Sequence, residues 1–375
     1  MDMPHLPTST ASSDAMEASR RNMEICNACR YCEGYCAVFP AMQLRTEFSA
    51  GDLNYLANLC HGCQGCFHAC QYAPPHEFGV NVPQAFATLR NESYAQYAWP
   101  KPLARVFQNN GTVVSLVLAA ALSLVIGLSL ALIDSAKLFG VHTGEGAFYR
   151  LISWGMMTSV AGATFGFSIL ALTIGGINFW RDAGPAKGRI APAPVGDAAI
   201  DVLTMKYLGG GAAGGCNDAD ASYSQARRHL HHATFYGFML CFASTSVATI
   251  YDHFLGLQAP YAFWSLPVQL GTWGGVSLMF GTAGLMWMKV IADPAAASKA
   301  LRGSDFAFVG LLFLTAFTGL LLLALRSTSA MGLMLAIHLG VILALFLLLP
   351  YCKFVHGLYR GLALLRNAMD KRNGL

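Results

Sequence analysis

Residues 306–352 read FAFVGLLFLTAFTGLLLLALRSTSAMGLMLAIHLGVILALFLLLPYC, and Arg326 is the only charged side chain among them. A helix that crosses a bilayer needs about 20 consecutive apolar residues, and the run on each side of Arg326 is long enough. Because a backbone amide in lipid has no water to bind, such runs fold as helices that satisfy their own hydrogen bonds. The stretch therefore predicts two consecutive transmembrane helices.

Four further apolar runs precede this pair. With flanking residues included, the predicted spans are about 112–133, 151–180, 233–253, 266–290, 306–325 and 331–356. Hydrophobic residues make up 55% of the 375 residues and charged residues 12%, against about 25% charged in soluble domains. This composition excludes a disordered chain, a small secreted scaffold and a nucleic-acid binder driven by basic charge. Buried helices of a soluble protein are the alternative, which six runs of this length disfavour.

Lysine and arginine lie mainly on one side of the predicted spans. If the N-terminus is cytoplasmic, the cytoplasmic segments from the second span onward carry 14 of these residues, and the outer loops carry three, Lys137, Arg150 and Arg326. This distribution follows the positive-inside rule, so both termini are expected in the cytoplasm. The first 24 residues are polar and Ser-rich without an apolar core, so we expect no cleaved secretory signal.

Eight of the 11 cysteines fall into two arrays with the same spacing, C-x-x-C-x-x-C-x-x-x-C. The arrays are Cys26, Cys29, Cys32 and Cys36, then Cys60, Cys63, Cys66 and Cys70. In the bacterial ferredoxin run, three cysteines spaced in this way ligate one cluster and the fourth ligates the other cluster. We therefore expect two 4Fe–4S clusters with crossed ligation, in which Cys70 completes the first set and Cys36 the second.

The arrays depart from the ferredoxin run at one point, because Ala37 and Gln71 stand where a proline usually follows the fourth cysteine. Zinc and disulfides are the competing interpretations. Structural zinc sites use four ligands in all, and disulfides need an oxidising compartment, which the charge bias opposes. His61, His68 and His76 lie nearby and are expected to be supporting or surface groups, because eight thiolates suffice.

The predicted organisation is mainly α, with a ferredoxin-like dicluster helical domain followed by a six-helix transmembrane bundle. Its parts are a disordered tail at 1–24, a cytoplasmic 4Fe–4S domain at 25–105, a membrane domain at 106–356 with a cytoplasmic loop at 181–232, and a cytoplasmic tail at 357–375. The loop contains glycine runs but no dinucleotide-binding pattern, which predicts a flexible connection. Cys241 and Cys352 lack metal-type neighbours and are expected to be packing residues.

The sixth predicted span carries two histidines, and polar groups inside a membrane are costly and usually functional. His338 and His356 are 18 residues apart, which is five turns at 3.6 residues per turn. Both side chains would face one direction if the helix continues past Pro350. A break at this proline would spoil their alignment.

The third predicted span also has histidines at both ends. His232 and His253 are 21 residues apart, about 60° from a shared face, whereas His231 is about 40° from the face of His253 and His229 about 120°. Because the third and sixth spans run antiparallel, imidazoles would oppose each other at two levels, as two bis-histidine b-type haems require. The predicted haem ligands are His232, with His231 as its alternative, and His253, His338 and His356. Histidines that only sit among lipid headgroups are the competing interpretation.

Four stretches carry a resemblance to a known family: Cys26–Pro40 (CNACRYCEGYCAVFP), Cys60–Pro75 (CHGCQGCFHACQYAPP), Arg227–His232 (RRHLHH) and Lys353–Arg360 (KFVHGLYR). Here the chain resembles tricarballylate utilization protein B, also called citrate utilization protein B. It is also similar to the membrane half of the cobalamin-pathway flavohaem protein of photosynthetic bacteria. The resemblance covers nearly the whole chain after the N-terminal tail.

The resemblance implies a role in the bacterial inner membrane. A partner FAD-dependent dehydrogenase would oxidise tricarballylate, and this chain would pass the electrons through the clusters and haem to membrane quinone. The chain would then be an electron-transfer component of an oxidoreductase complex. A redox-sensing membrane protein without quinone reductase activity and a zinc-binding membrane anchor are the alternatives.

Overall fold

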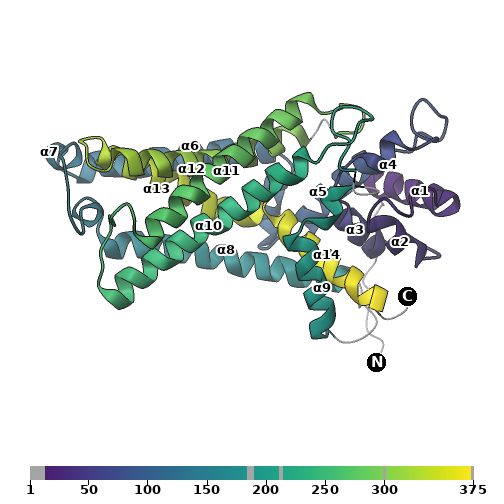
Figure 1. The fold of residues 1–375 in the computed structure, drawn as a ribbon, viewed down its shortest axis with the longest axis horizontal. Coiled ribbons are helices and arrows are strands. Elements are labelled where there is room, and N and C mark those ends of the chain that lie inside the picture. Colours follow the sequence, from purple (N-terminus) through teal and green to yellow (C-terminus); the bar gives the residue numbers. More distant parts are fainter. Residues whose placement is uncertain (1–12, 184–189, 211–213, 299–300, 373–375) are drawn as a thin grey trace.

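The computed structural model describes residues 13–183, 190–210, 214–298 and 301–372. Within these ranges the regular structure is helical, and an isolated antiparallel bridge between Cys216 and Ser224 is the one β-pairing. The long helices form an elongated bundle, and a group of shorter helices lies at one end of it (Figure 1). The predicted mainly α fold, with an N-terminal domain before a six-helix bundle, is confirmed.

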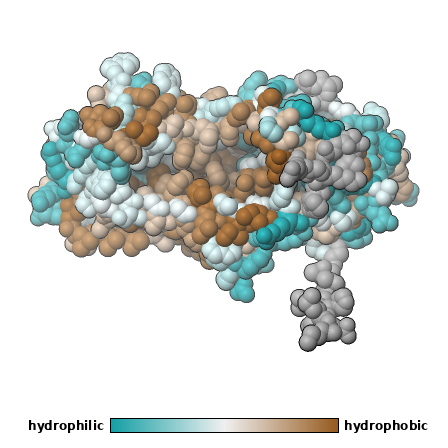
Figure 2. Space-filling model, turned by 90° about the horizontal axis from the view of Figure 1, so that it is seen from below, coloured by the Kyte–Doolittle hydropathy of each residue, from teal (hydrophilic) through white to brown (hydrophobic). Residues whose placement is uncertain are grey.

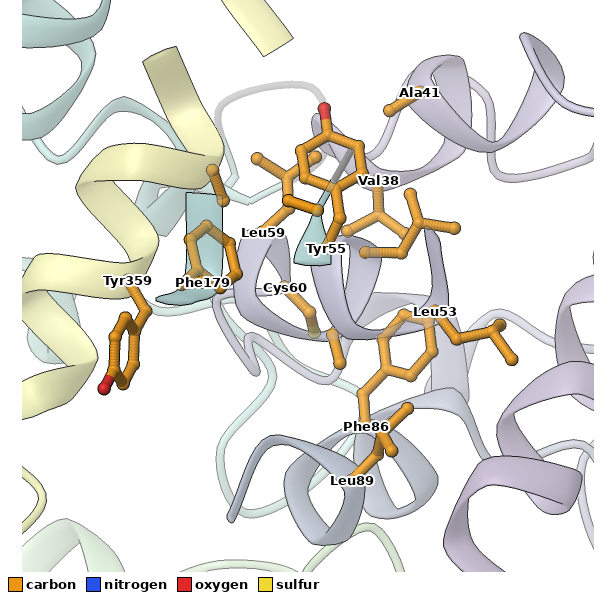
Figure 3. Packing of buried hydrophobic residues seen from close by; sticks show 14 of the residues in the cluster. Val38, Ala41, Leu53, Tyr55, Leu59, Cys60, Phe86, Leu89, Phe179 and Tyr359 are labelled. Atoms are coloured by element: carbon orange, nitrogen blue, oxygen red, sulfur yellow. The ribbon is translucent and has the colours of Figure 1, made fainter. Parts of the chain in front are cut away.

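The described part of the N-terminal domain is built from five helices, three of which have a polar side chain as N-cap. Its helices are α1 (Asp14–Cys29), α2 (Val38–Gln43), α3 (Ala50–Leu59), α4 (Gly65–His68) and α5 (Val82–Tyr97). The side chains of Ser49 and Asn81 accept hydrogen bonds from the first turns of α3 and α5, which satisfies amide groups that have no partner within the helix. Leu53 and Phe86 are fully buried in a shared core between these helices (Figure 3).

The predicted disordered tail is wrong for residues 14–24, because these residues form most of α1. Ser19 and Met23 of α1 are fully buried against the rest of the domain. The segment has few apolar residues, so its helix depends on packing that a local pattern does not reveal. Residues 1–12 lie outside the described part of the chain.

Among the described residues, six helices are long and apolar enough to cross a membrane, which indicates a multi-pass membrane protein and agrees with the predicted spans. They are α6 (Asn110–Leu132), α8 (Trp154–Asp182), α10 (Ala226–Leu255), α11 (Leu266–Ile291), α12 (Arg302–Leu325) and α13 (Met331–Leu348). The 3-10 helix η1 (Lys101–Phe107) leads from α5 to α6, and α7 (Ser135–Leu138) and η2 (Phe148–Arg150) lie between α6 and α8. Figure 2 shows apolar side chains over the middle of the molecule and polar side chains at its two ends.

The sixth span is interrupted at the proline. Helix α13 ends at Leu348, the 3-10 turn η6 (Leu349–Tyr351) contains Pro350, and α14 (Val355–Arg372) follows. Proline lacks the amide proton that a continuing helix needs, and its ring clashes with the preceding turn. The helical count that placed His338 and His356 on one face therefore does not apply.

The predicted cytoplasmic tail at 357–375 is wrong as a separate tail, because α14 belongs to the core of the N-terminal domain. Tyr359 and Ala363 are buried there, and Figure 3 shows Tyr359 and Phe179 of α8 beside this core. The end of α8 is fixed to the same domain, since Asn54 Nδ2 donates a hydrogen bond of 2.9 Å to Asp182. Helices α8 and α14 therefore join the two domains.

The predicted flexible loop at 181–232 contains regular structure. It holds α9 (Pro192–Leu203) and the 3-10 helix η3 (Lys206–Gly209), and its last seven residues belong to α10, which begins at Ala226. Its segments 184–189 and 211–213 lie outside the described residues. The histidines at the start of the third span therefore sit on the first turns of a helix, at the boundary with the N-terminal domain.

Candidate redox site

The structure brings the eight array cysteines to two neighbouring cavities. One cavity is lined by Cys26, Cys29, Cys32, Cys66 and Cys70. The other is lined by Cys36, Cys60, Cys63 and Cys66. The fourth cysteine of each array thus lies with the first three of the other array, which is the arrangement that crossed ligation requires.

Left-handed turns inside the arrays direct the sulfurs into the cavities. Helix α1 ends at Cys29, and Arg30 then adopts a φ of 55°, which reverses the chain before Cys32. In the second array, Gly62 and Gln64 have φ values of 65° and 62°, and Gln64 begins the short helix α4, which carries Cys66. Residues other than glycine rarely adopt this conformation, so tertiary packing fixes both turns.

The buried thiols of the arrays perturb one another. Burial raises the pKa of Cys26 to about 12, and the neighbouring Cys32, Cys70 and Cys29 add to the shift. Burial likewise raises the pKa of Cys32 to about 11, with Cys70 and Cys29 contributing. Thiolates packed this closely repel one another, so the sites favour a cationic cluster that displaces the protons and neutralises the charge.

Cys63 differs from the other array cysteines, because its pKa is lowered to about 6. The largest cause is a hydrogen bond from the side chain of Cys216, and the backbone of Gly65 and the charge of Arg227 act in the same direction against burial. Cys216 is fully buried and belongs to the loop before α10. In the sequence, Cys216 has no other cysteine or histidine at ligand spacing, so no local pattern marks it.

The sulfur positions suit a cluster better than a single ion. Among the described residues, no three His, Cys, Asp or Glu side chains converge closely enough to hold one metal ion. Each set of four sulfurs instead surrounds a cavity, and a cluster fills the space between its ligands with iron and sulfide.

Two histidines face each other where α10 and α14 meet. The ring centroids of His231 and His356 are 6.0 Å apart, at an interplanar angle of 71°. If a b-type haem binds here, these two imidazoles would hold its iron. The carbonyl of Lys353 can only accept a hydrogen bond, so His356 Nδ1 carries the proton and Nε2 keeps its lone pair.

The structure places His231, and not His232, opposite His356. The ring of His232 lies 5.9 Å from that of Tyr236. Successive helical residues point about 100° apart, so only one of the two neighbours can face α14. Of the two neighbours, the structure favours the stated alternative, His231, and haem ligation by either residue stays a prediction.

The second predicted histidine pair is not brought together. The exposed His253 packs its ring 4.9 Å from that of Trp154 in α8. His338 instead shares a hydrogen bond of 3.0 Å with Thr318 Oγ1 of α12. No ring contact between described residues joins His253 to His338, so the two-level arrangement stays a prediction.

Three arginines bind the loop of the second array. The carbonyl oxygen of Cys60 accepts hydrogen bonds from Arg90 (2.6 Å) and Arg360 (2.7 Å). The carbonyl oxygen of Gly62 accepts one from Arg227 (2.5 Å). Because Arg360 and Arg227 each lie four residues from one of the facing histidines, one turn of α14 and one turn of α10 connect this loop to the histidine pair.

The remaining histidines and cysteines agree with their predicted supporting roles. His61 Nδ1 bonds to the Leu59 carbonyl at 2.9 Å, and His68 lies 3.9 Å from the carboxylate of Asp293. The ring of His76 packs between Tyr72 and Phe78. Cys352 is fully buried, and Cys241 packs against the apolar core of the bundle.

The fold and the site together define a multi-pass membrane protein with a ferredoxin-like redox domain. The family model described as Citrate utilization protein B matches residues 108–374, and its Fer4-like domain matches residues 19–96. The chain is 49% identical over 355 residues to the Citrate utilization protein B of Escherichia coli, covering 94% of this chain and 92% of that protein. No solved structure matches the chain.

The chain therefore belongs to the citrate utilization protein B family, as the resemblance predicted. Membership in this family and the Fer4-like domain indicate a role in iron–sulfur electron transfer.

Proposed function

We propose that the protein is a membrane electron-transfer subunit that carries electrons from a flavoprotein dehydrogenase to membrane quinone. The observation that carries the proposal is the crossed placement of eight cysteines around two cavities, beside the His231–His356 pair. Two 4Fe–4S clusters and a b-type haem would supply the one-electron carriers at these positions. The residues of this chain bind, separate and insulate them.

The contacts of the second array favour one order in which electrons would pass through the two clusters to the haem. The loop that contains Cys60 is bound by Arg360 of α14, one turn beyond His356. The first array lies in the other cavity, whose rim includes Tyr31, with 68% of its side chain exposed. Electrons would therefore enter near Cys26, Cys29, Cys32 and Cys70 and leave through the set that includes Cys60.

The partner and the location are part of the same proposal. The family resemblance supports an FAD-dependent dehydrogenase of the tricarballylate type as the electron donor, and substrate specificity would then reside in that protein. The excess of lysine and arginine on one side supports a bacterial inner membrane location with both termini in the cytoplasm. This orientation places the first array where a cytoplasmic flavoprotein can dock.

Metal and haem analysis of anaerobically purified protein tests the proposal. About eight irons per chain are expected in clusters, with a further iron for each haem. Replacing His356 with alanine is expected to remove the haem spectrum and quinone reduction while the cluster iron is retained. Colourless protein without iron would refute the proposal. An intact response to oxygen in His356→Ala, together with wild-type protein that reduces no quinone, would favour the redox-sensor alternative.

A further inference from the structure

Cys216 lies outside both arrays, yet its side chain is buried in one small cluster with that of an array cysteine, Cys63. The side chain of Cys216 is fully buried in a small apolar cluster with Met205 and Leu208. Cys63 and Cys216 are 153 positions apart in the sequence, so their contact is created by the fold alone.

Backbone hydrogen bonds fix the position of Cys216 relative to Cys63. The amide of Asn217 donates to the carbonyl oxygen of Cys63 at 2.9 Å. Cys216 and Ser224 exchange two backbone hydrogen bonds, of 2.8 and 2.9 Å, in the isolated bridge. Arg227, which ion-pairs with Asp218, also donates to the Gly62 carbonyl on the array loop. Hydrogen bonds therefore hold the segment around Cys216 against the loop of the second array.

The thiol of Cys216 donates to the carbonyl oxygen of Leu208 at 3.3 Å, and the sulfur of Cys63 belongs to the same buried cluster. When Cys63 ligates a cluster it is a thiolate, and a charged acceptor binds a donor more strongly than a neutral carbonyl does. The S–H of Cys216 would then point at the Cys63 sulfur. Hydrogen bonds to ligand sulfurs are among the factors that set the reduction potential of an iron–sulfur cluster.

Cys216 is placed behind Cys63 and not within the cavity. The cavity of the second set is lined by Cys36, Cys60, Cys63 and Cys66, and Cys216 is absent from its lining. Four sulfurs already complete the ligands of one cubane cluster. The geometry therefore favours a hydrogen-bond donor over a fifth ligand.

We propose that Cys216 is a positioning residue that donates its S–H to the Cys63 thiolate and raises the reduction potential of the cluster held by Cys36, Cys60, Cys63 and Cys66. Reduction adds one negative charge to the cluster, and a donor at a ligand sulfur stabilises that charge. The exit cluster then has a higher potential than it would have without Cys216. The inference rests on the proposed cluster ligation.

Redox titration of the full-length protein, followed by electron paramagnetic resonance, tests the inference. Cys216→Ala is expected to make the midpoint potential of one cluster more negative and to leave that of the other unchanged, with the iron content of the wild type. A tenfold loss of relative stability of the reduced form corresponds to about 59 mV for one electron. Cys216→Ser keeps a donor and is expected to give a smaller shift.

Cys241→Ala, a matched change in α10 among apolar residues of the bundle, is the control and should shift neither potential. Unshifted potentials in Cys216→Ala would overturn the inference, and so would loss of one cluster's iron in both Cys216 variants, since a ligand would behave in that way. Wild-type protein without clusters would refute the proposed function instead. The two failures are therefore distinguishable.

Discussion

Helix α11 contacts α10 so closely at Gly281 that even a methyl group has no room. A Cβ atom at Gly281 would lie 2.5 Å from the backbone nitrogen of Thr234 and 2.7 Å from the carbonyl oxygen of Leu230. Both are helix backbone atoms, which cannot rotate away as a flexible side chain can. To restore an ordinary contact of 3.4 Å in Gly281→Ala, the helices must separate by about 0.9 Å.

The expected cost of Gly281→Ala follows from this separation. Overpacking a well-packed core costs typically 1–3 kcal/mol, and a clash with backbone belongs at the upper end of that range. Replacing a helical glycine with alanine also stabilises the helix by about 1 kcal/mol, which offsets part of this cost. We therefore expect the free energy of unfolding to fall by about 2 kcal/mol. Since His231 lies one turn before Thr234, the separation also moves its ring relative to His356 and should lower haem occupancy.

Unfolding in detergent, followed by circular dichroism, and the haem-to-protein absorbance ratio measure both effects. Gly310→Ala is the matched control, because a Cβ at this position of α12 meets no atom within 4 Å. It is expected to leave stability unchanged or to raise it by up to about 1 kcal/mol. Equal stability and haem content in the two variants would refute the close packing of α10 against α11.

Three further predictions follow from single side chains. His231→Leu is expected to abolish the b-type haem spectrum, whereas His232→Leu is expected to keep it, because only the ring of His231 faces that of His356. Equal reduced-minus-oxidised spectra of the two variants would contradict this prediction. Arg360→Met is expected to slow haem reduction by the clusters at unchanged iron content, as measured by stopped flow, and a wild-type rate would exclude this route. Although burial raises the pKa of Asp52, hydrogen bonds from Arg45 and a serine outweigh it and lower the pKa. The stabilisation is therefore present at neutral pH and lost as the pH falls below about 3.9, so Asp52→Asn should flatten the acid side of the stability curve.

The spans and the cysteine arrays could be predicted because both are local patterns. A run such as 306–325 is apolar at every turn, so lipid is the environment that suits it whatever its neighbours are. The array spacing lies within 11 residues, a length over which backbone geometry fixes where sulfurs can reach. The structure has the corresponding helix α12 and two cysteine-lined cavities.

The choice between His231 and His232 could not be made in the same way. Both residues lie on α10, and the rotation of that helix is set by its contact with α11 at glycines such as Gly281. The position of His356 also depends on where the chain resumes its helix after Pro350. A helical count assumes one continuous helix, and the proline invalidates that assumption.

By itself, the amino-acid sequence determined six membrane helices and two ferredoxin-type cysteine arrays, because each depends on residues within one helix or one short loop. The tertiary structure decided which imidazole meets His356, that α14 belongs to the core of the N-terminal domain, and that Cys216 reaches Cys63. These contacts join residues more than 100 positions apart, and they depend on how helices rotate and dock.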